Sequence, residues 1–264
     1  VEDGSLVYAN GEKKDVSKVT DADGTVGTWT ISEDVLKAIE NGGTDAADIA
    51  ALQKEDFPSK EDYTYEAEKT VTLVDLKGKD YDDPAWEELL NEMKNSEFHA
   101  LFNNAGYGTA AIESIEKPKT FEYDGPAGIS NMITGKGAFS YPTEVMVAAT
   151  FNDELMEHMG ELVGEDGIQT NTSGWYAPAV NIHRTPFSGR NYEYFSEDPL
   201  LSGNAGAAIT RGVQSKGVYV YMKHFALNDQ ETNRAANGNV ATWSNEQAIR
   251  EIYLRPFQIG VQEG

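Results

Sequence analysis

Residues 217–234, GVYVYMKHFALNDQETNR, are the stretch that decides the fold. The first seven, up to Lys223, are mostly aromatic, β-branched or apolar, which predicts a buried strand. His224 then begins a polar run that continues to Arg234. In α/β folds built on a parallel sheet, functional side chains gather where strands end. This stretch therefore predicts one strand of such a sheet, followed by a candidate site.

Two earlier segments repeat this pattern of a strand followed by polar residues. The extended run TFEY at 120–123 leads into Asp124, and the apolar run WYAPAVNI at 175–182 leads into the mixed aromatic and charged segment HRTPFSGRNYEYFSEDP at 183–199. Asp124 alone is a weak signal, because Asp-Gly-Pro forms a turn in many proteins. Together the three segments predict polar side chains at one edge of a parallel sheet.

Helical spacing of apolar residues separates the predicted strands, over 143–163 and near 205–214. A last helix is predicted over 244–257, where Ser244 is a good N-cap and Gln247 completes a capping box. Repeated strand and helix units favour a parallel sheet with helices outside, either a doubly wound sheet or a barrel. Polar clusters at strand ends favour the (β/α)8 barrel, the TIM-barrel-like α/β class.

The barrel is expected to be incomplete in this chain. A full barrel needs about 250 residues, whereas the repeating units begin near residue 80 and supply about four strands. They start with a helix near 84–93, after which 98–102 is predicted as a strand and 110–115 as a helix. We assign residues 76–264 to the N-terminal part of the barrel domain.

Residues 1–75 are predicted to be an acidic extension or interdomain linker, because they are rich in Gly, Asp, Thr and Ser and show little periodicity. One helix is predicted there, over 32–39, and a small independent domain is the alternative. The chain starts at Val1 without Met or an apolar leader, which suggests a processed or excised piece.

The composition excludes several classes of partner and chemistry. A net charge of -23 argues against nucleic acid and anionic membranes, which would be repelled. No run approaches the roughly 20 apolar residues that span a bilayer. The absence of cysteine excludes disulfides and thiolate chemistry and leaves the compartment open between cytoplasmic and secreted.

Metal and nucleotide chemistry receive little support from the sequence. His183 and His224 lack the spacing of a zinc-binding helix, so no metal site is expected. No phosphate-binding loop is present, Gly106 and Gly108 are followed by Ala111 where a dinucleotide loop has glycine, and no serine elbow occurs. No cofactor is expected. Basic donors mixed with carboxylates instead suit a ring of hydroxyls, although a solvated loop is the bland alternative.

In order along the chain, DGPAG at 124–128, GRNYEYFSEDP at 189–199 and KHFALNDQETNR at 223–234 resemble the catalytic barrel domain of glycoside hydrolase family 3. The last two motifs are highly specific, and the resemblance covers roughly residues 75–264. The form of the motif at 223–231 is more similar to the β-glucosidase and β-xylosidase branch than to the N-acetylglucosaminidase branch.

The resemblance implies a retaining β-glycosidase that hydrolyses terminal non-reducing β-D-glucosyl residues. Asp124 would accept hydrogen bonds from glycone hydroxyls, and Arg190, Lys223, His224 and Arg234 would donate to or line the same subsite. His224 would therefore bind sugar and would not shuttle protons. The expected substrate is a β-glucoside or oligosaccharide.

The resemblance also implies that no catalytic residue lies in this chain. Family members form a glycosyl-enzyme on an Asp with a Glu as acid/base; the Asp is expected beyond Gly264 and the Glu in a separate sandwich domain. The isolated chain is thus expected to be inactive until another polypeptide, or the rest of the chain, completes the barrel. The alternatives are a non-catalytic carbohydrate-binding protein and a β-xylosidase of the same family.

Overall fold

The computed structural model describes residues 67–264, except for 105, 132, 133, 233, 235–241 and 243, and the backbone of four short strands near the N-terminus. The chain divides into two compact units, Val1–Asp62 and Tyr63–Gly264. In the first unit, strand β1 (Ser5–Val7) pairs with β2 (Lys13–Asp15), and β3 (Lys18–Thr20) pairs with β4 (Val26–Thr28), both antiparallel. The helix predicted over 32–39 lies outside the described residues. The role of residues 1–75 stays a prediction.

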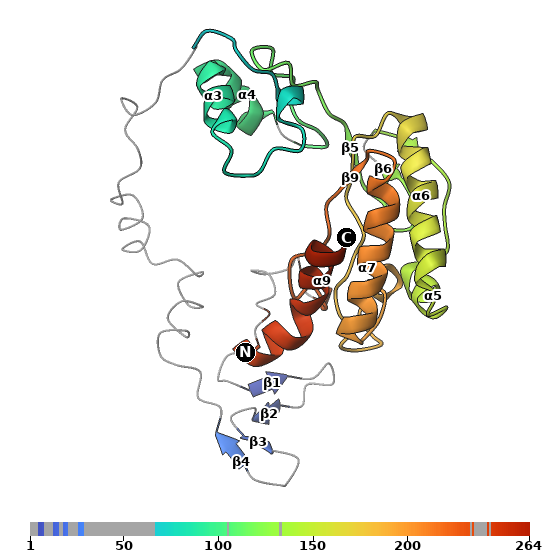
Figure 1. Ribbon diagram of the computed structural model, residues 1–264. Helices are drawn as coiled ribbons and strands as arrows, with labels where there is room; N and C mark the ends of the chain where they lie inside the picture. Colours follow the sequence, from blue (N-terminus) through green and yellow to red (C-terminus); the bar gives the residue numbers. More distant parts are fainter. Residues whose placement is uncertain are drawn as a thin grey trace. The chain divides into compact units, whose positions relative to one another are not determined.

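The centre of the second unit is a parallel sheet of three short strands in the order β5 (Glu122–Tyr123), β8 (Gly174–Trp175), β9 (Tyr219–Val220). Helix α6 (Asp153–Thr170) connects the first two strands, and α7 (Pro199–Gln214) connects the last two. Figure 1 shows α6 and α7 running side by side, with α9 (Arg255–Glu263) next to α7. The predicted alternation of strands and helices around a parallel sheet is confirmed.

The sheet has two faces of different chemistry. Tyr123, Trp175 and Val220 are in register and face the helices, where Tyr123 and Trp175 join the main core. Successive side chains of a strand point to opposite faces. Glu122 and Tyr219, which share a register with Gly174, therefore lie on the other face.

Two glycines set the distance between α6 and α7. A Cβ atom built on Gly160 would lie 2.3 Å from the carbonyl oxygen of Ile209, and one built on Gly212 would lie 2.1 Å from that of Glu157. These distances are too short for any other residue, so the two helix backbones touch at this crossing.

A separate small core precedes the sheet. It joins the 3-10 helix η2 (Leu73–Leu76), α3 (Ala85–Glu92), α4 (Asn95–Asn103) and two isoleucines, Ile112 and Ile115. Of the apolar face predicted for α3, Leu89 and Met93 are buried, whereas Leu90 is about half exposed.

Two predicted elements in this region are wrong. Residues 98–102 lie inside α4 and do not form a strand, because Glu97 accepts from the backbone N–H of Lys94 at 2.8 Å and caps a helix that packs Phe98 and Leu101 on the small core. Residues 110–115 do not form a helix. Ile112 instead makes a two-way backbone bridge with Lys117, with N···O distances of 2.9 and 3.0 Å.

Three helix boundaries also differ from prediction. The helix predicted over 143–163 is two helices, α5 (Glu144–Ala148) and α6, because Asn152 caps a new start by accepting from the N–H of Leu155. Helix α7 begins earlier than predicted, since Asp198 caps it. The cap of the last helical segment is Asn245, which accepts from the N–H of Ala248 at 2.7 Å, and not Ser244.

That segment comprises α8 (Glu246–Ala248), the π-helical turn η4 (Ile249–Tyr253) and α9. The remaining described elements are the hairpin strands β6 (Ser130–Asn131) and β7 (Lys136–Gly137), and the 3-10 turn η3 (Asn191–Glu193). In the described part of the chain, no helix combines the length and apolar character needed to cross a membrane.

Candidate functional site

The three predicted polar segments meet at one edge of the sheet. Asp124 directly follows β5, and Lys223 follows β9, where it forms a parallel bridge with Ala179 from the segment after β8. Because the strands are parallel, their carboxyl ends share this edge. The structure thus brings together the residues that the sequence singled out.

Asp124 and Lys223 form an ion pair and hydrogen bond between Oδ1 and Nζ. Asp124 also accepts from the backbone N–H of Gly125 at 2.8 Å. Burial raises the pKa of Asp124, but the hydrogen bond and charge of Lys223 outweigh it and hold that pKa below its usual value. The Asp124 side chain is 45% exposed, whereas that of Lys223 is 13% exposed, so the carboxylate is the accessible partner.

His224 is neutral and has protein partners on both ring nitrogens. Arg190 Nη2 lies 2.9 Å from Nε2, and Tyr194 Oη lies 3.0 Å from Nδ1. Arginine can only donate, so Nε2 accepts and Nδ1–H donates to Tyr194. Burial, together with the charges of Arg190 and Lys223, lowers the pKa of His224 to about 3.

A buried amide holds the backbone of His224. The Asn181 side chain donates from Nδ2 to the His224 carbonyl at 2.9 Å and accepts from the His224 N–H at 2.6 Å. The Asn228 amide donates to Tyr194 Oη at 2.8 Å. We did not single out these three supporting residues from the sequence; an amide inside the apolar run 175–182 was the available signal for Asn181.

Carboxylates connect the arginines of the site. Arg190 donates from Nε to the buried Glu193, and its Nη1 lies 3.7 Å from Oε1 of Glu231. Arg234 Nη1 lies 3.1 and 3.2 Å from the two carboxylate oxygens of Glu231. Arg234 is therefore linked to Arg190 through Glu231.

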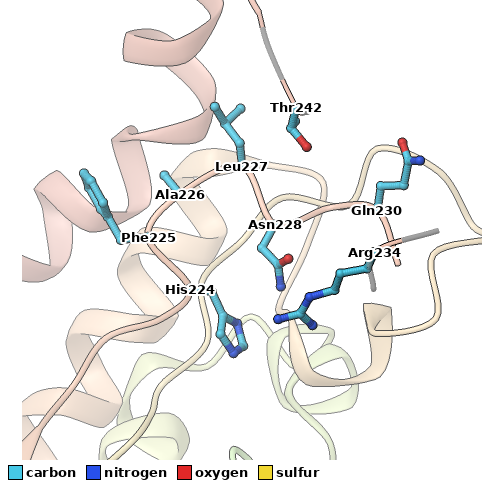
Figure 2. Close-up of a pocket in the computed structure, with 8 residues that line it drawn as sticks. All are labelled: His224, Phe225, Ala226, Leu227, Asn228, Gln230, Arg234 and Thr242. Atoms are coloured by element: carbon cyan, nitrogen blue, oxygen red, sulfur yellow. The ribbon is translucent and has the colours of Figure 1, made fainter. Parts of the chain in front are cut away.

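A pocket of about 460 Å³ opens beside this network, a volume within the range of small-molecule sites. It is lined by residues of the 224–234 segment and by Thr242. Figure 2 shows the His224 ring, the Asn228 amide and the Arg234 guanidinium directed toward the same part of the pocket, whereas the Phe225 ring points away. Asp124, Lys223 and Arg190 do not line it.

Glu144, at the start of α5, is a further carboxyl group that we did not identify from the sequence. It is 1% exposed, and neither of its carboxyl oxygens has a hydrogen-bond partner. Burial, with a smaller contribution from the negative charge of Glu193, raises the pKa of Glu144 to about 8, although Lys223 opposes this. Glu144 is therefore protonated at neutral pH.

The ionised groups of the network balance. Lys223, Arg190 and Arg234 supply three positive charges, and Asp124, Glu193 and Glu231 supply three negative ones. Within the described residues, no group of three or more His, Cys, Asp or Glu side chains is arranged to hold a metal ion. The chemistry of the site is thus that of hydrogen-bond donors and acceptors suited to a neutral polar ligand.

Comparison with known proteins finds β-glucosidases among the relatives of this chain. The β-glucosidase A of Butyrivibrio fibrisolvens is 37% identical over 235 residues, which cover 89% of this chain and 27% of that protein. The β-glucosidase of Ruminococcus albus is 35% identical over 232 residues, covering 82% and 23%. This chain therefore spans about a quarter of the length of the curated relatives it matches.

Solved structures agree with these relatives. The β-glucosidase from Kluyveromyces marxianus, in a crystal structure with glucose, is 34% identical with a TM-score of 0.61, over 67% of this chain and 21% of that one. The β-glucosidase from Paenibacillus barengoltzii is 28% identical with a TM-score of 0.63, over 83% and 24%. Both sequence identities are high enough to indicate kinship as well as a shared fold.

A family profile matches most of the second unit. The profile described as "Glycosyl hydrolase family 3 N terminal domain" matches residues 93–264. The resemblance drawn from the sequence motifs is confirmed. The chain belongs to glycosyl hydrolase family 3, and the region that matches is part of the TIM-barrel-like α/β domain of that family.

Proposed function

We propose that this chain supplies the glycone-binding subsite of a retaining β-glycosidase that acts on terminal β-D-glucosyl residues. The observation that carries the proposal is the Asp124–Lys223 pair at the carboxyl edge of the parallel sheet, beside the network of Arg190, His224 and Arg234. Its relatives are β-glucosidases, which supports the same reading.

The proposed ligand contacts follow from which groups are still free to bond. Asp124 is half exposed and ionised, so its second oxygen can accept from sugar hydroxyls. Lys223 uses one N–H on Asp124 and has others to donate, and Arg234 is about half exposed with unused N–H groups beside the pocket. A ring of hydroxyls requires this mixture of donors and acceptors.

Arg190 and His224 already use most of their hydrogen-bonding groups on protein partners. Arg190 is largely occupied by Glu193 and His224, and both ring nitrogens of His224 already have partners. A neutral imidazole with a pKa near 3 does not exchange protons at neutral pH. His224 therefore lines the subsite and bonds to a sugar only by exchanging one of its present partners.

Retaining hydrolysis requires a nucleophilic carboxylate and an acid/base carboxyl group on either side of the glycosidic bond. Near this site, Asp124, Glu193 and Glu231 are each paired with a basic side chain, and Glu144 is buried. We assign neither catalytic role to them. We propose that both lie outside these 264 residues, the nucleophilic Asp on polypeptide that completes the barrel and the acid/base Glu on a separate sandwich domain.

The proposal is tested by glucose binding to the 264-residue chain, measured by NMR titration, with hydrolysis of an aryl β-D-glucoside followed in parallel. Glucose should bind without turnover. Asp124→Asn and Lys223→Met should each weaken binding by about 10- to 100-fold, because each removes a charge-assisted hydrogen bond. Lys216→Met is the matched control, since the Lys216–Glu165 pair is another lysine–carboxylate contact, at 3.0 Å, outside the site.

Turnover at a normal rate by this chain would overturn the assignment of the nucleophile, and unchanged affinity in both site variants would overturn the subsite. A non-catalytic carbohydrate-binding protein is the alternative, which the same donors and acceptors support as well. Intact and native mass spectrometry of the purified protein distinguishes the two functions. A second polypeptide that co-purifies with this chain and restores hydrolysis favours the glycosidase. Comparing glucose with xylose tests the β-xylosidase alternative.

A further inference from the structure

An ion pair outside the proposed subsite connects the two loops that form it. Arg184 Nε lies 3.0 Å from Oδ2 of Asp229. Arg184 belongs to the segment after β8 that also carries Arg190, and Asp229 belongs to the segment after β9 that carries His224 and Glu231. The pair is therefore a further connection between loops that already meet through Arg190, Tyr194 and Asn181.

The carboxylate of this pair is buried and has few partners. The Asp229 side chain is 2% exposed, its Oδ1 has no hydrogen-bond partner, and the Arg184 side chain is 49% exposed. Burial raises the pKa of Asp229, and Arg184 opposes that rise. Because Asp229 is buried, losing its charged partner is strongly unfavourable, whereas the pair contributes little net stability over an apolar replacement. Such a pair is better explained by the geometry it imposes than by stability.

Arg184 also contacts a third segment. Its guanidinium carbon lies 6.0 Å from the ring centroid of Tyr253, within the range of a cation–π contact. Tyr253 ends the π-helical turn η4, and π-helical turns are frequent at functional sites. Arg184 therefore touches both the loop of Asp229 and the last helical segment.

We propose that Arg184 and Asp229 are positioning residues, which hold the loops of Arg190 and His224 in register and so set the affinity for a sugar that neither residue touches. The inference rests on the proposed function and adds a determinant of affinity outside the ligand contacts. Its direct structural consequence is the Arg190 to His224 contact of 2.9 Å, which depends on the relative placement of the two loops.

The test uses Asp229→Asn and Arg184→Met, singly and together, in the 264-residue chain. The measurements are the glucose Kd, the ¹⁵N signals of the His224 imidazole and the thermal unfolding midpoint. We expect each single variant to weaken glucose binding about tenfold and to shift the His224 signals, and the double variant to be no worse than either, because coupled partners are not additive. Arg184→Lys, which keeps the charge, should recover part of both effects.

The matched control is the Arg211–Glu157 pair, which has the same Nε to carboxylate distance of 3.0 Å but lies on α6 and α7. Glu157→Gln and Arg211→Lys should change neither glucose affinity nor the His224 signals. If Asp229→Asn lowers only the unfolding midpoint and leaves affinity and His224 as in the parent, the positioning role is wrong. If the parent chain fails to bind glucose, the proposed function fails, and the His224 signals still decide the positioning role.

Discussion

Two carboxylates that lie two residues apart, Glu122 in β5 and Asp124 directly after it, have different surroundings. Glu122 is 4% exposed and accepts hydrogen bonds from three tyrosine hydroxyls, those of Tyr176 at 2.7 Å and of Tyr219 and Tyr221 at 2.9 Å. Asp124, two residues later, is half exposed and accepts from Lys223 and from the backbone N–H of Gly125.

The two acids differ in how much of their hydrogen-bonding capacity the protein itself uses. Three neutral donors fill the acceptor positions of Glu122, so it has little capacity left for a ligand. The tyrosines link Glu122 of β5 to β9 and to the residues that directly follow β8 and β9. Lys223 fixes the charge state of Asp124 while leaving one of its oxygens accessible. The first acid stabilises the fold, and the second is available for binding.

Replacing Glu122 should have the largest effect on this contrast. Glu122→Ala removes the shared acceptor of three partly buried tyrosine hydroxyls, and we expect the free energy of unfolding in urea to fall by about 3–5 kcal/mol. Glu116→Ala, at an exposed glutamate paired with Lys69, should change it by less than about 0.5 kcal/mol. A loss below about 1 kcal/mol for Glu122→Ala would show that the tyrosine cluster is not structural.

Glu144 extends the comparison to a buried carboxyl group that has no side-chain donor. Its pKa rises from 4.5 in the unfolded chain to about 8 in the folded one, so the folded state keeps a proton that the unfolded state loses. The stability associated with this proton is complete below pH 4.5 and is lost as the pH rises to about 8. Roughly 5 kcal/mol is the upper limit for this loss.

Glu144→Gln, which mimics the protonated form, should remove that part of the pH dependence. In unfolding curves measured from pH 5 to 8, the free energy of unfolding of the variant should rise relative to that of the parent by about 1–3 kcal/mol toward pH 8. Parallel curves for parent and variant would mean that Glu144 is ionised throughout.

Removing one tyrosine hydroxyl should have a smaller effect than removing their shared acceptor. Tyr221→Phe leaves Glu122 with two donors, so the expected loss is about 1 kcal/mol in the same urea experiment. If the loss matched that of Glu122→Ala, Tyr221 alone would carry the cluster and the other two hydroxyls would be incidental.

Asp124 should contribute least to stability. Its lowered pKa means that its contribution is present above the unfolded pKa of 3.8 and is lost as the pH falls through the lower folded value. Because the side chain is half exposed, solvent screening should keep the effect of Asp124→Asn on unfolding at pH 7 below about 1 kcal/mol. A larger loss would assign Asp124 to the structural group with Glu122.

The sequence predicted the parallel sheet and its edge because strand runs of apolar residues end abruptly in polar motifs. Asp124, Arg190, Lys223, His224 and Arg234 could be named for the same reason, aided by the family resemblance. Their substrate contacts stay a prediction.

What the sequence could not predict depends on contacts between distant segments. The aromatic run 98–102 has strand propensity, but a small core and the cap by Glu97 make it helical. Glu144 looks like an ordinary helix-start residue, and only the packing of α5 against η3 explains its burial. The three tyrosines around Glu122 come from two different segments. Tyr176 lies 43 residues before Tyr219 and 45 before Tyr221, so no local sequence pattern joins them.

The backbone contact at Gly160 and Gly212 fixes the spacing of α6 and α7, the two helices that precede β8 and β9. Helix α6 leads into β8 and α7 leads into β9, so any change in the spacing of the two helices is passed on to the ends of those strands. A methyl group at either glycine would push the two helices apart. Asn181 would then move relative to the His224 peptide, to which it makes two hydrogen bonds. The alignment of the sheet edge that carries Asp124 and Lys223 thus depends on two residues of the helix layer that have no side chain.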